Sequence, residues 1–361
     1  MKSSDDRGVR PLIVTTDELL LDDLLRLAAA AGATPEVAAD VVAARRSWST
    51  AGMVVIGHEL VSQVAGLRLP RRDSVLVVSA QPGDPAVWAG ALALGAEDVV
   101  TLPDRQVEVI DAFGDCLDGG GRRGTTIGVV SGCGGGGGTT FAAALALTAA
   151  GQGRTTLLVD ADPLGGGIDL VLGCEDASGM RWPDLASTKG RLAAATLREA
   201  LPRVHELSVL SWDRGAVLSI PAESMRSVVS AGQRGHDLLV VDLPRRLDAA
   251  AEEALIRASV TLLVVPAEVR AVAAASRVLS ALREVAREVG LVVRGPGPSG
   301  LDAAAVAESL GADLWAQMRA ERGVTRCLDE GLGPVRRRRG PLVGCCSTVL
   351  DSIAGRGAAA A

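Results

Sequence analysis

The sequence predicts two α/β domains in tandem, each built on a mainly parallel sheet. Short apolar runs that end in turn residues alternate with segments of helical periodicity, which is typical of parallel strands covered by helices on both faces. A stretch rich in glycine and arginine, "LDGGGRRGTT" at 117–126, interrupts the alternation and has the composition of a linker. A chain of 361 residues is also too long for one compact core, so two or three domains are expected.

The predicted elements follow from these runs. Four apolar runs in the first half are expected to be strands: "PLIVTT", "GMVVIG", "SVLVVSA" and "EDVVTLP". The segment "DELLLDDLLRLAAAAG" carries apolar residues at the spacing of one helix face. In the second half the candidate strands are "TTIGVVSG", "TTLLVDAD", "LSVLSW", "HDLLVVDLP", "TLLVVPAE", "LVVRG" and "ADLWAQM", with helices that include 140–151, 221–234, 248–259 and 269–289. We expect one domain at 1–117, a linker at 118–124, a second domain at 125–345 and a C-terminal tail at 346–361.

The composition argues against several classes of protein. With 48% hydrophobic and 22% charged residues the chain is globular rather than disordered, and its net charge of −6 argues against a general nucleic-acid binder. The six cysteines form no CxxC pair and the three histidines are far apart, which argues against a metal centre or a disulfide framework. No opening segment resembles a secretory signal, and no apolar run approaches the roughly 20 residues that span a bilayer. The expected location is the cytoplasm.

One segment has the organisation of a phosphate-binding loop: "VVSGCGGGGGTTFAAALAL" at 129–147. A strand, a glycine loop and a helix N-terminus surround an anion with backbone N–H groups and the positive end of the helix dipole. Each glycine costs about 0.5–1 kcal/mol of backbone freedom relative to alanine, so the close approach of a ligand explains five in a row better than drift in a decayed loop does. The candidate nucleotide-binding residues are Gly134, Gly135, Gly136, Gly137, Gly138, Thr139 and Thr140.

Residues 133–140, "CGGGGGTT", resemble the loop KGGxGK[ST]T of the MinD/ParA family of deviant Walker ATPases. Within that family the two-domain order is similar to the CpaE-like or TadZ-like branch. The resemblance implies a P-loop NTPase-like fold for the second domain. It places Cys133 at the signature lysine, Gly138 at the general Walker lysine and Thr139 at the hydroxyl that ligates Mg²⁺.

Two acidic segments extend the resemblance in the expected order. "TLLVDADPLGGGIDLVLG" at 156–173 is similar to the family's strand and switch segment, which implies that Asp160 lies near the metal. By the same likeness Asp162 matches the carboxylate that positions the attacking water, here a vestigial catalytic residue. "HDLLVVDLP" at 236–244 resembles the Walker B strand, where Asp242 would hold Mg²⁺ through water. If a nucleotide binds, the implied metal residues are therefore Thr139, Asp160 and Asp242; the alternative is that Asp160 and Asp162 only cap a turn.

The absence of both loop lysines predicts weak binding and little catalysis. A charged hydrogen bond contributes about 1.5–3 kcal/mol, so each lost lysine weakens ATP binding on the order of 10- to 150-fold. Phosphoryl transfer also needs positioned positive charge in the transition state, so we expect hydrolysis to be slow or absent. Arg154 and Arg245 are near in sequence, but nothing in the sequence brings either to the phosphates. Cys133 is expected to be a buried apolar thiol.

The first half resembles a response-regulator receiver domain, a flavodoxin-like fold, over residues 9–117. Gly57 stands where that family has its phosphorylated aspartate, and Leu102 stands before Pro103 where a lysine is expected. Ser79 fits the family's hydroxyl, while Asp17 is expected to cap a helix rather than bind a metal. The sequence therefore predicts a degenerate receiver that serves docking or dimerisation.

The lysine-free loop and "DADPLGGGIDL" are most similar to the septum site-determining proteins of actinobacteria. This resemblance implies a non-hydrolysing or weakly hydrolysing regulator of septum site selection and cell division. The alternatives are a localisation factor for a tight-adherence pilus or secretion system, an active partitioning-type ATPase and, third, a transcriptional response regulator. The implied partners are a second copy of the chain and division or pilus-assembly proteins, with peripheral membrane association at the septum, the pole or the inner face of the membrane. No sequence-specific nucleic acid is expected, and "RRRR" at 336–339 is expected to be solvated.

Overall fold

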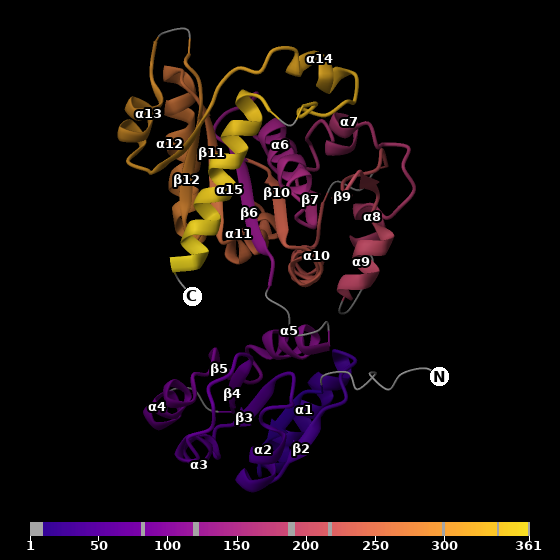
Figure 1. Ribbon diagram of the computed structural model, residues 1–361, viewed down its shortest axis with the longest axis vertical. Helices are drawn as coiled ribbons and strands as arrows, with labels where there is room; N and C mark the ends of the chain where they lie inside the picture. The colour runs from indigo at the N-terminus through magenta and orange to yellow at the C-terminus, as the bar shows by residue number, and fades with distance from the viewer. Residues whose placement is uncertain are drawn as a thin grey trace. The chain divides into compact units, whose positions relative to one another are not determined.

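The chain divides into two compact units, Met1–Arg122 and Arg123–Ala361, each of which is an α/β domain (Figure 1). The structure is a computed structural model that describes residues 10–80, 84–117, 123–186, 192–215, 219–297, 300–337 and 339–359. Most of the linker predicted at 118–124 lies outside these ranges. The predicted fold class, two α/β domains with mainly parallel sheets, is confirmed in both units.

The first unit is a five-stranded parallel sheet in the order β2-β1-β3-β4-β5. Its strands are β1 (Leu12–Val14), β2 (Glu36–Ala38), β3 (Val54–Gly57), β4 (Val75–Ser79) and β5 (Asp98–Thr101). Its helices are α1 (Glu18–Ala30), α2 (Val41–Ser47), α3 (Val61–Gly66), α4 (Pro85–Leu94) and α5 (Gln106–Leu117). Successive strand residues point to opposite faces, so one face packs on α1 and α5 and the other on α2, α3 and α4.

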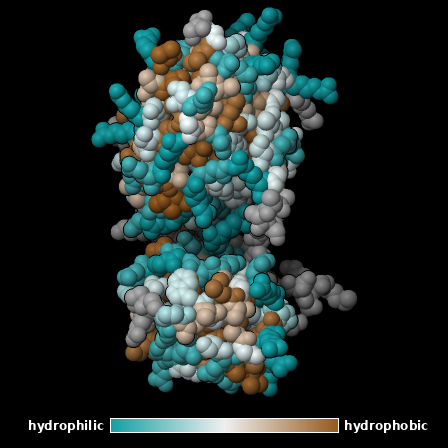
Figure 2. All heavy atoms as spheres, turned by 90° about the vertical axis from the view of Figure 1, so that its left-hand side faces the viewer, coloured by the Kyte–Doolittle hydropathy of each residue, from teal (hydrophilic) through white to brown (hydrophobic). Residues whose placement is uncertain are grey.

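Local signals explain two features of this unit. Asp17 caps α1, because its carboxylate accepts the backbone N–H groups of Leu19 and Leu20, as the sequence predicted. Strand β2 was not predicted: it has three residues, and both Glu36 and Val37 are exposed at the edge of the sheet. Helix α4 leaves Trp88 and Leu92 exposed, and the surface on its side of the unit mixes apolar with hydrophilic groups (Figure 2).

The second unit is an eight-stranded sheet in the order β13-β12-β11-β6-β10-β7-β9-β8. Its strands are β6 (Thr125–Ser131), β7 (Thr156–Asp160), β8 (Arg203–Val204), β9 (Leu207–Leu210), β10 (Leu238–Leu243), β11 (Val260–Pro266), β12 (Val289–Arg294) and β13 (Leu314–Met318). All strand pairs are parallel except β8 with β9. Strand β8 is a two-residue edge strand that the sequence analysis missed. The carboxyl ends of β6, β7 and β10 therefore meet at one edge, which is where a parallel sheet of this kind places its ligand site.

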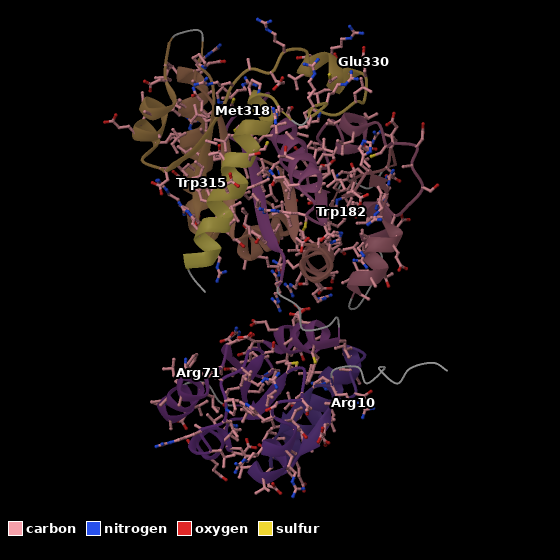
Figure 3. All side chains as sticks on the ribbon, in the orientation of Figure 1. Arg10, Arg71, Trp182, Trp315, Met318 and Glu330 are labelled. Atoms are coloured by element: carbon pink, nitrogen blue, oxygen red, sulfur yellow. The ribbon has the colours of Figure 1, made fainter. Side chains whose placement is uncertain are left out.

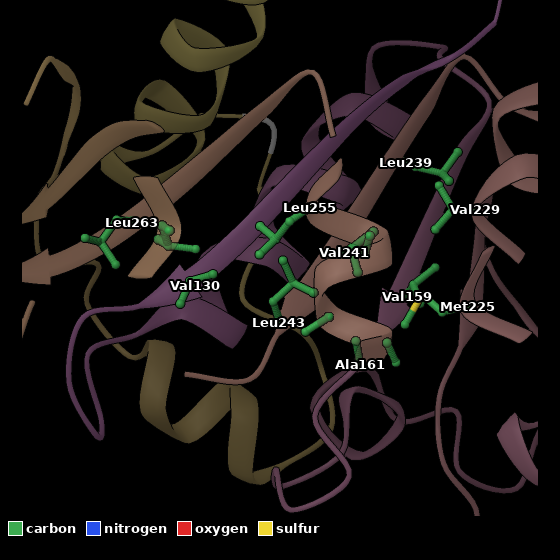
Figure 4. Packing of buried hydrophobic residues seen from close by; sticks show 14 of the residues in the cluster. Val130, Val159, Ala161, Met225, Val229, Leu239, Val241, Leu243, Leu255 and Leu263 are labelled. Carbon is green, nitrogen blue, oxygen red and sulfur yellow. The ribbon is translucent and has the colours of Figure 1, made fainter. Parts of the chain in front are cut away.

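Helices cover both faces of this sheet. They are α6 (Gly138–Gly151), α7 (Ile168–Leu172), α8 (Trp182–Ala186), α9 (Ala194–Ala200), α10 (Ala222–Gly235), α11 (Ala249–Arg257), α12 (Val269–Val285), α13 (Ala303–Leu310), α14 (Val324–Asp329) and α15 (Pro341–Ala359). Alternate residues of β10, Leu239 and Val241 among them, pack with Met225 and Val229 of α10 on one face (Figure 4). The intervening residues Leu238 and Val240 belong to the core beneath α6 and α15 on the other.

The C-terminal helix α15 is part of the second unit. The boundary predicted at 345 falls inside this helix, because Cys345, Cys346 and Val349 are buried in the core that includes α6 and β13. Near the end of the helix the Arg356 guanidinium lies 4.4 Å from the ring centroid of Trp315. Among the residues that the structure describes, no helix combines the length and the hydropathy that crossing a membrane requires.

Candidate functional site

The glycine loop connects the end of β6 to the start of α6 and has the backbone shape of an anion-binding loop. Gly132 N–H donates to Val264 O at 2.8 Å, which ties the loop to β11, and α6 begins at Gly138. Gly135 and Gly137 have φ angles of +67° and +97°, a region that only glycine enters without strain. The N-terminus of α6 therefore follows the loop directly, as in a phosphate-binding loop, and Gly138 N–H at its first position is bonded to Ser131 Oγ.

The position of the general Walker lysine is closed by local packing. Gly138 N–H donates to Ser131 Oγ at 2.9 Å. A Cβ atom at Gly138 would lie 2.4 Å from that Oγ, which is far inside van der Waals contact. The loop is thus packed around glycine at 138, and a lysine there would displace the Ser131 side chain.

Asp242, at the carboxyl end of β10, lies beside the first turn of α6. Its side chain is 5% exposed, and the Thr139 hydroxyl is its hydrogen-bond partner. Burial and, to a smaller extent, the charges of Asp160 and Asp162 raise the pKa of Asp242 to about 8. At neutral pH this carboxyl therefore carries a proton that an arriving cation would displace.

The other two predicted carboxylates hold the segment that follows β7. Asp160 pairs in register with Asp242 and is 2% exposed. Its carboxylate accepts Ile168 N–H at 2.9 Å and the Ser211 hydroxyl at 3.0 Å, and burial raises its pKa to about 6. Asp162 accepts Leu164 N–H at 3.1 Å and is half-buried. Both carboxylates thus make the hydrogen bonds expected of the turn-capping alternative, and their roles at a metal and in catalysis stay predictions.

The donors beside the loop fit a magnesium ion that arrives with a nucleotide. Within the described ranges no group of three or more His, Cys, Asp and Glu side chains is arranged to hold a metal ion. Magnesium bound with a nucleotide needs fewer protein ligands than that, since phosphate oxygens and water complete its six oxygen ligands. The Thr139 hydroxyl and the adjacent Asp242 carboxyl supply the two protein groups that such an ion uses.

Two arginines lie near the loop, although neither occupies the position of a lysine: Arg294, which the sequence analysis did not single out, and Arg245, which it named only as near in sequence. Arg294, at the end of β12, donates from Nη1 to Gly135 O at 3.0 Å. Arg245 follows β10, and its Nη2 is 3.9 Å from the place of a Cβ on Gly134. Arg154 precedes β7 and therefore stands at the opposite edge of the sheet. The chain's two lysines, Lys2 and Lys189, lie outside the described residues.

A cavity of about 470 Å³ opens beside the loop. Its polar lining includes Thr140 and Arg294 beside the loop and the carboxylates of Glu268 and Glu321. Pro296, Met318 and Leu342 are among the apolar residues of its wall (Figure 3 labels Met318). This volume is within the range of small-molecule sites, and an apolar wall beside a phosphate-binding loop suits a nucleoside. Gly295 and Met318 end strands that the sequence predicted, whereas Pro296, Gly297 and the lining residues between Arg319 and Leu328 were not identified as part of a site.

One prediction about the loop is wrong. Cys133, expected to be a buried thiol, is half-buried at the mouth of the loop. Its carbonyl oxygen accepts Gly136 N–H at 3.1 Å, so Cys133 belongs to the turn of the loop and not to the core.

In the first unit the carboxylate of Glu59 fills the place that a phosphoacceptor aspartate at position 57 would occupy. Glu59 accepts the Thr15 hydroxyl and, at 2.9 Å, Thr16 N–H. A Cβ at Gly57 would lie 2.4 Å from Glu59 Oε2 and 2.7 Å from Thr15 Oγ1. Leu102, at the expected lysine position, is buried in the core. The pocket in which a receiver would hold its phosphate is thus closed by Glu59.

We expect Gly57→Asp not to create a phosphorylation site. The new side chain would collide with Glu59, so we expect a loss of about 1–3 kcal/mol in stability and no phosphate uptake from acetyl phosphate. Intact-mass spectrometry and thermal unfolding measure the two effects. Gly57→Asp with Glu59→Ala is the matched control and should regain stability. A base-labile aspartyl phosphate on the single variant, or on wild type between Pro11 and Leu117, would contradict this reading.

A family of known proteins matches the first unit, and two relatives match nearly the whole chain. The family described as "Rv3660c-like, CheY-like N-terminal domain" matches residues 14–124. Protein Rv3660c of Mycobacterium tuberculosis (strain ATCC 25618 / H37Rv) is 40% identical over 342 residues, which cover 94% of this chain and 96% of that protein. Protein MT3760 of M. tuberculosis strain CDC 1551 / Oshkosh matches to the same extent.

Solved structures resemble the second unit in fold. MinD cell division protein of Aquifex aeolicus is 22% identical with a TM-score of 0.53, covering 64% of this chain and 97% of that one. A ParA family ATPase from Chlorobium tepidum TLS is 16% identical with a TM-score of 0.57, covering 63% and 97%. The septum site-determining protein MinD of Pyrococcus horikoshii OT3, complexed with Mg-ADP, is 20% identical with a TM-score of 0.54, covering 63% and 95%. The chain therefore belongs to the Rv3660c-like family, in which a CheY-like domain precedes a domain with the MinD/ParA fold.

Proposed function

We propose that this protein is a spatial regulator of septum site selection and cell division that binds Mg-nucleotide weakly and hydrolyses it very slowly or not at all. The observation that carries the proposal is the glycine loop: its backbone keeps the shape that binds phosphate, while Ser131 closes the position of the catalytic lysine. The fold shared with MinD and ParA proteins supports the assignment to cell division.

Binding rests on groups that remain at the loop. Backbone N–H groups, the N-terminus of α6 and the Arg294 guanidinium would face the phosphates, and the cavity beside Gly137 would take the nucleoside. Magnesium, when bound through Thr139 and Asp242, would offset the charge of the phosphates. Since a single arginine replaces two lysines at this loop, we expect an affinity well below that of an intact Walker site.

Turnover lacks its positioned cations. Arg245 is exposed, and Arg294 contacts the loop from the β12 side through Gly135. The Asp162 carboxylate accepts Leu164 N–H through one oxygen in the turn after β7, and the Asp162→Ala variant below tests whether the carboxylate also orients an attacking water. Positioned charge supplies much of the rate of phosphoryl transfer, so its loss lowers catalysis more than binding.

A regulator without a nucleotide cycle must act through what it binds and where it sits. We propose a homodimer held by protein surfaces, with division proteins or pilus-assembly proteins as further partners and recruitment from the cytoplasm to the septum, the pole or the inner face of the membrane. The exposed Trp88 and Leu92 of α4, and Ile256 on α11, are apolar side chains available for self-association. A pilus localisation factor would have the same biochemical properties and would differ only in its partner.

We expect purified protein with Mg-ATP to show no turnover above background, because no cation occupies the position of either lysine. Phosphate release under saturating ATP measures this, and calorimetry measures binding in the same buffer. Analytical ultracentrifugation should give the same degree of self-association with and without Mg-ATP.

Asp162→Ala and Asp242→Ala are the controls for this experiment. Background phosphate release should be equal in wild type and Asp162→Ala. Turnover that Asp162→Ala abolishes, or a wild-type monomer that dimerises only with Mg-ATP while Asp242→Ala stays monomeric, would restore an ATP-driven switch and defeat the proposal.

A further inference from the structure

A second cavity in the second unit is lined by arginines. It measures about 730 Å³ and lies where the segment after β13, the helix α14 and the start of α15 meet. Four guanidinium-bearing side chains line it: Arg322, Arg336, Arg337 and Arg339. Figure 1 shows that α14 and the chain leading to α15 run past one end of the sheet, beyond α6.

These arginines are not neutralised by neighbouring acids. None of the four has a hydrogen bond or an ion pair with any residue in the described ranges. The one acidic side chain among the described lining residues is Glu321, which accepts Leu342 N–H at 3.1 Å and so caps the start of α15. Glu330, the residue after α14, is paired with Arg326 of that helix, and neither side chain lines the cavity.

The local charge is opposite to that of the chain. Residues 319–339 contain seven arginines and three acidic residues, although the whole chain has a net charge of −6. Like charges gathered in a concave wall repel one another more than charges spread over a convex surface, because the low dielectric of the wall focuses their field. An anion in the cavity would relieve this repulsion. Arg336, Arg337 and Arg339 are exposed, as the sequence predicted for the run 336–339, so a ligand can reach them from solvent.

We propose that this cavity binds a group carrying two or more phosphates, either in a soluble polyphosphate compound or in a lipid headgroup. A guanidinium group binds phosphate with two parallel hydrogen bonds. Four such groups supply more donors than the oxygens of a single phosphate can accept in this geometry. The volume suits a ligand of nucleotide size. The cavity shares lining residues such as Val324 and Leu342 with the one beside the glycine loop, but Arg294 belongs only to the latter. This binding does not depend on the function proposed above.

The test measures binding of sodium tripolyphosphate to the full chain by calorimetry, with EDTA present so that no magnesium bridges the ligand to the glycine loop. We expect Arg336→Gln/Arg337→Gln to weaken binding about 100-fold or more, since two charged hydrogen bonds are lost. Arg277→Gln/Arg326→Gln removes the same charge from exposed helix positions outside the cavity and should change binding by less than about threefold. Arg294→Gln removes the cation at the glycine loop, so any tripolyphosphate binding that it abolishes belongs to that loop and not to this cavity. All replaced side chains except Arg294 are exposed, so thermal unfolding should match wild type.

A parallel arm distinguishes the two sources of phosphate. If a lipid headgroup is the ligand, wild type should sediment with vesicles of phosphatidylcholine that contain one fifth cardiolipin. Added tripolyphosphate should then release it from the vesicles. Sedimentation lost in Arg336→Gln/Arg337→Gln supports the lipid source, and tripolyphosphate binding alone supports the soluble one. Four outcomes would overturn the proposal. Two concern the variants: all of them bind equally, or binding is lost in Arg294→Gln instead. The other two concern the ligand: the protein binds duplex DNA but not tripolyphosphate, or it shows no binding at millimolar tripolyphosphate.

Discussion

Gly138→Lys combined with Ser131→Ala should tighten Mg-ATP binding about 10- to 150-fold over wild type, because it restores one charged hydrogen bond to the phosphates. The second substitution is needed because a Cβ at 138 would lie 2.4 Å from Ser131 Oγ. The loop already has its positive-φ glycines at 135 and 137 and its helix N-terminus in position. Calorimetric titration with Mg-ATP measures the gain.

Two variants isolate the effect of the lysine. Gly138→Lys alone should be less stable than the double variant, by about 1–3 kcal/mol, since Ser131 must leave its hydrogen bond with Gly138 N–H. Gly151→Lys adds the same charge at the other end of α6, where a new Cβ has open space, and should leave nucleotide affinity unchanged. If the double variant and Gly151→Lys bind Mg-ATP equally, the loop does not hold phosphates and the nucleotide part of our proposal fails.

The fold was predictable because its strands are buried on both faces. Runs such as "HDLLVVDLP" contain no alternation, as expected for a strand between two helical layers, and β10 is buried throughout. The elements that were missed lack this signal. Strand β8 has two residues, and the helices α7 and α8 have five each, which is too short for a helical period to be recognised.

The site was predictable only where its residues are local in sequence. The glycine loop, Thr139 and the carboxylates at the ends of β7 and β10 could be identified from spacing and family likeness. Arg294 could not, because its contact with Gly135 spans 159 residues and depends on how β12 lies in the sheet. Glu59 was equally hidden: it reaches back to Thr15 across 44 residues, and only the empty place at Gly57 explains why it fits.

Asp242→Asn should stabilise the nucleotide-free protein at alkaline pH. An unfolded aspartate has a pKa of about 3.9, whereas burial raises that of Asp242 to about 8 in the folded state. A raised folded pKa means that the folded chain keeps a proton that the unfolded chain releases. The stability that this proton contributes is complete below about pH 4 and is lost progressively between about pH 4 and pH 8.

Asparagine is neutral throughout that range and still offers an oxygen to the Thr139 hydroxyl. Wild type and Asp242→Asn should therefore be equally stable near pH 4, and the variant should be ahead by about 2–5 kcal/mol above pH 8. Urea unfolding of the second unit from pH 4 to pH 9 measures the difference. Asp302→Asn, at the exposed cap of α13, is the control and should follow the wild-type profile.

The same proton connects stability to ligand binding. A magnesium ion at Thr139 and Asp242 requires the ionised carboxylate, so wild type should release close to one proton when Mg-nucleotide binds near pH 7, and Asp242→Asn should release none. Calorimetry in buffers of different ionisation enthalpy counts that proton. Parallel stability profiles for wild type and Asp242→Asn across pH 4–9 would mean that Asp242 is already ionised without a cation. In that case burial at the end of β10 would not be what keeps the Asp242 carboxyl protonated when no cation is bound.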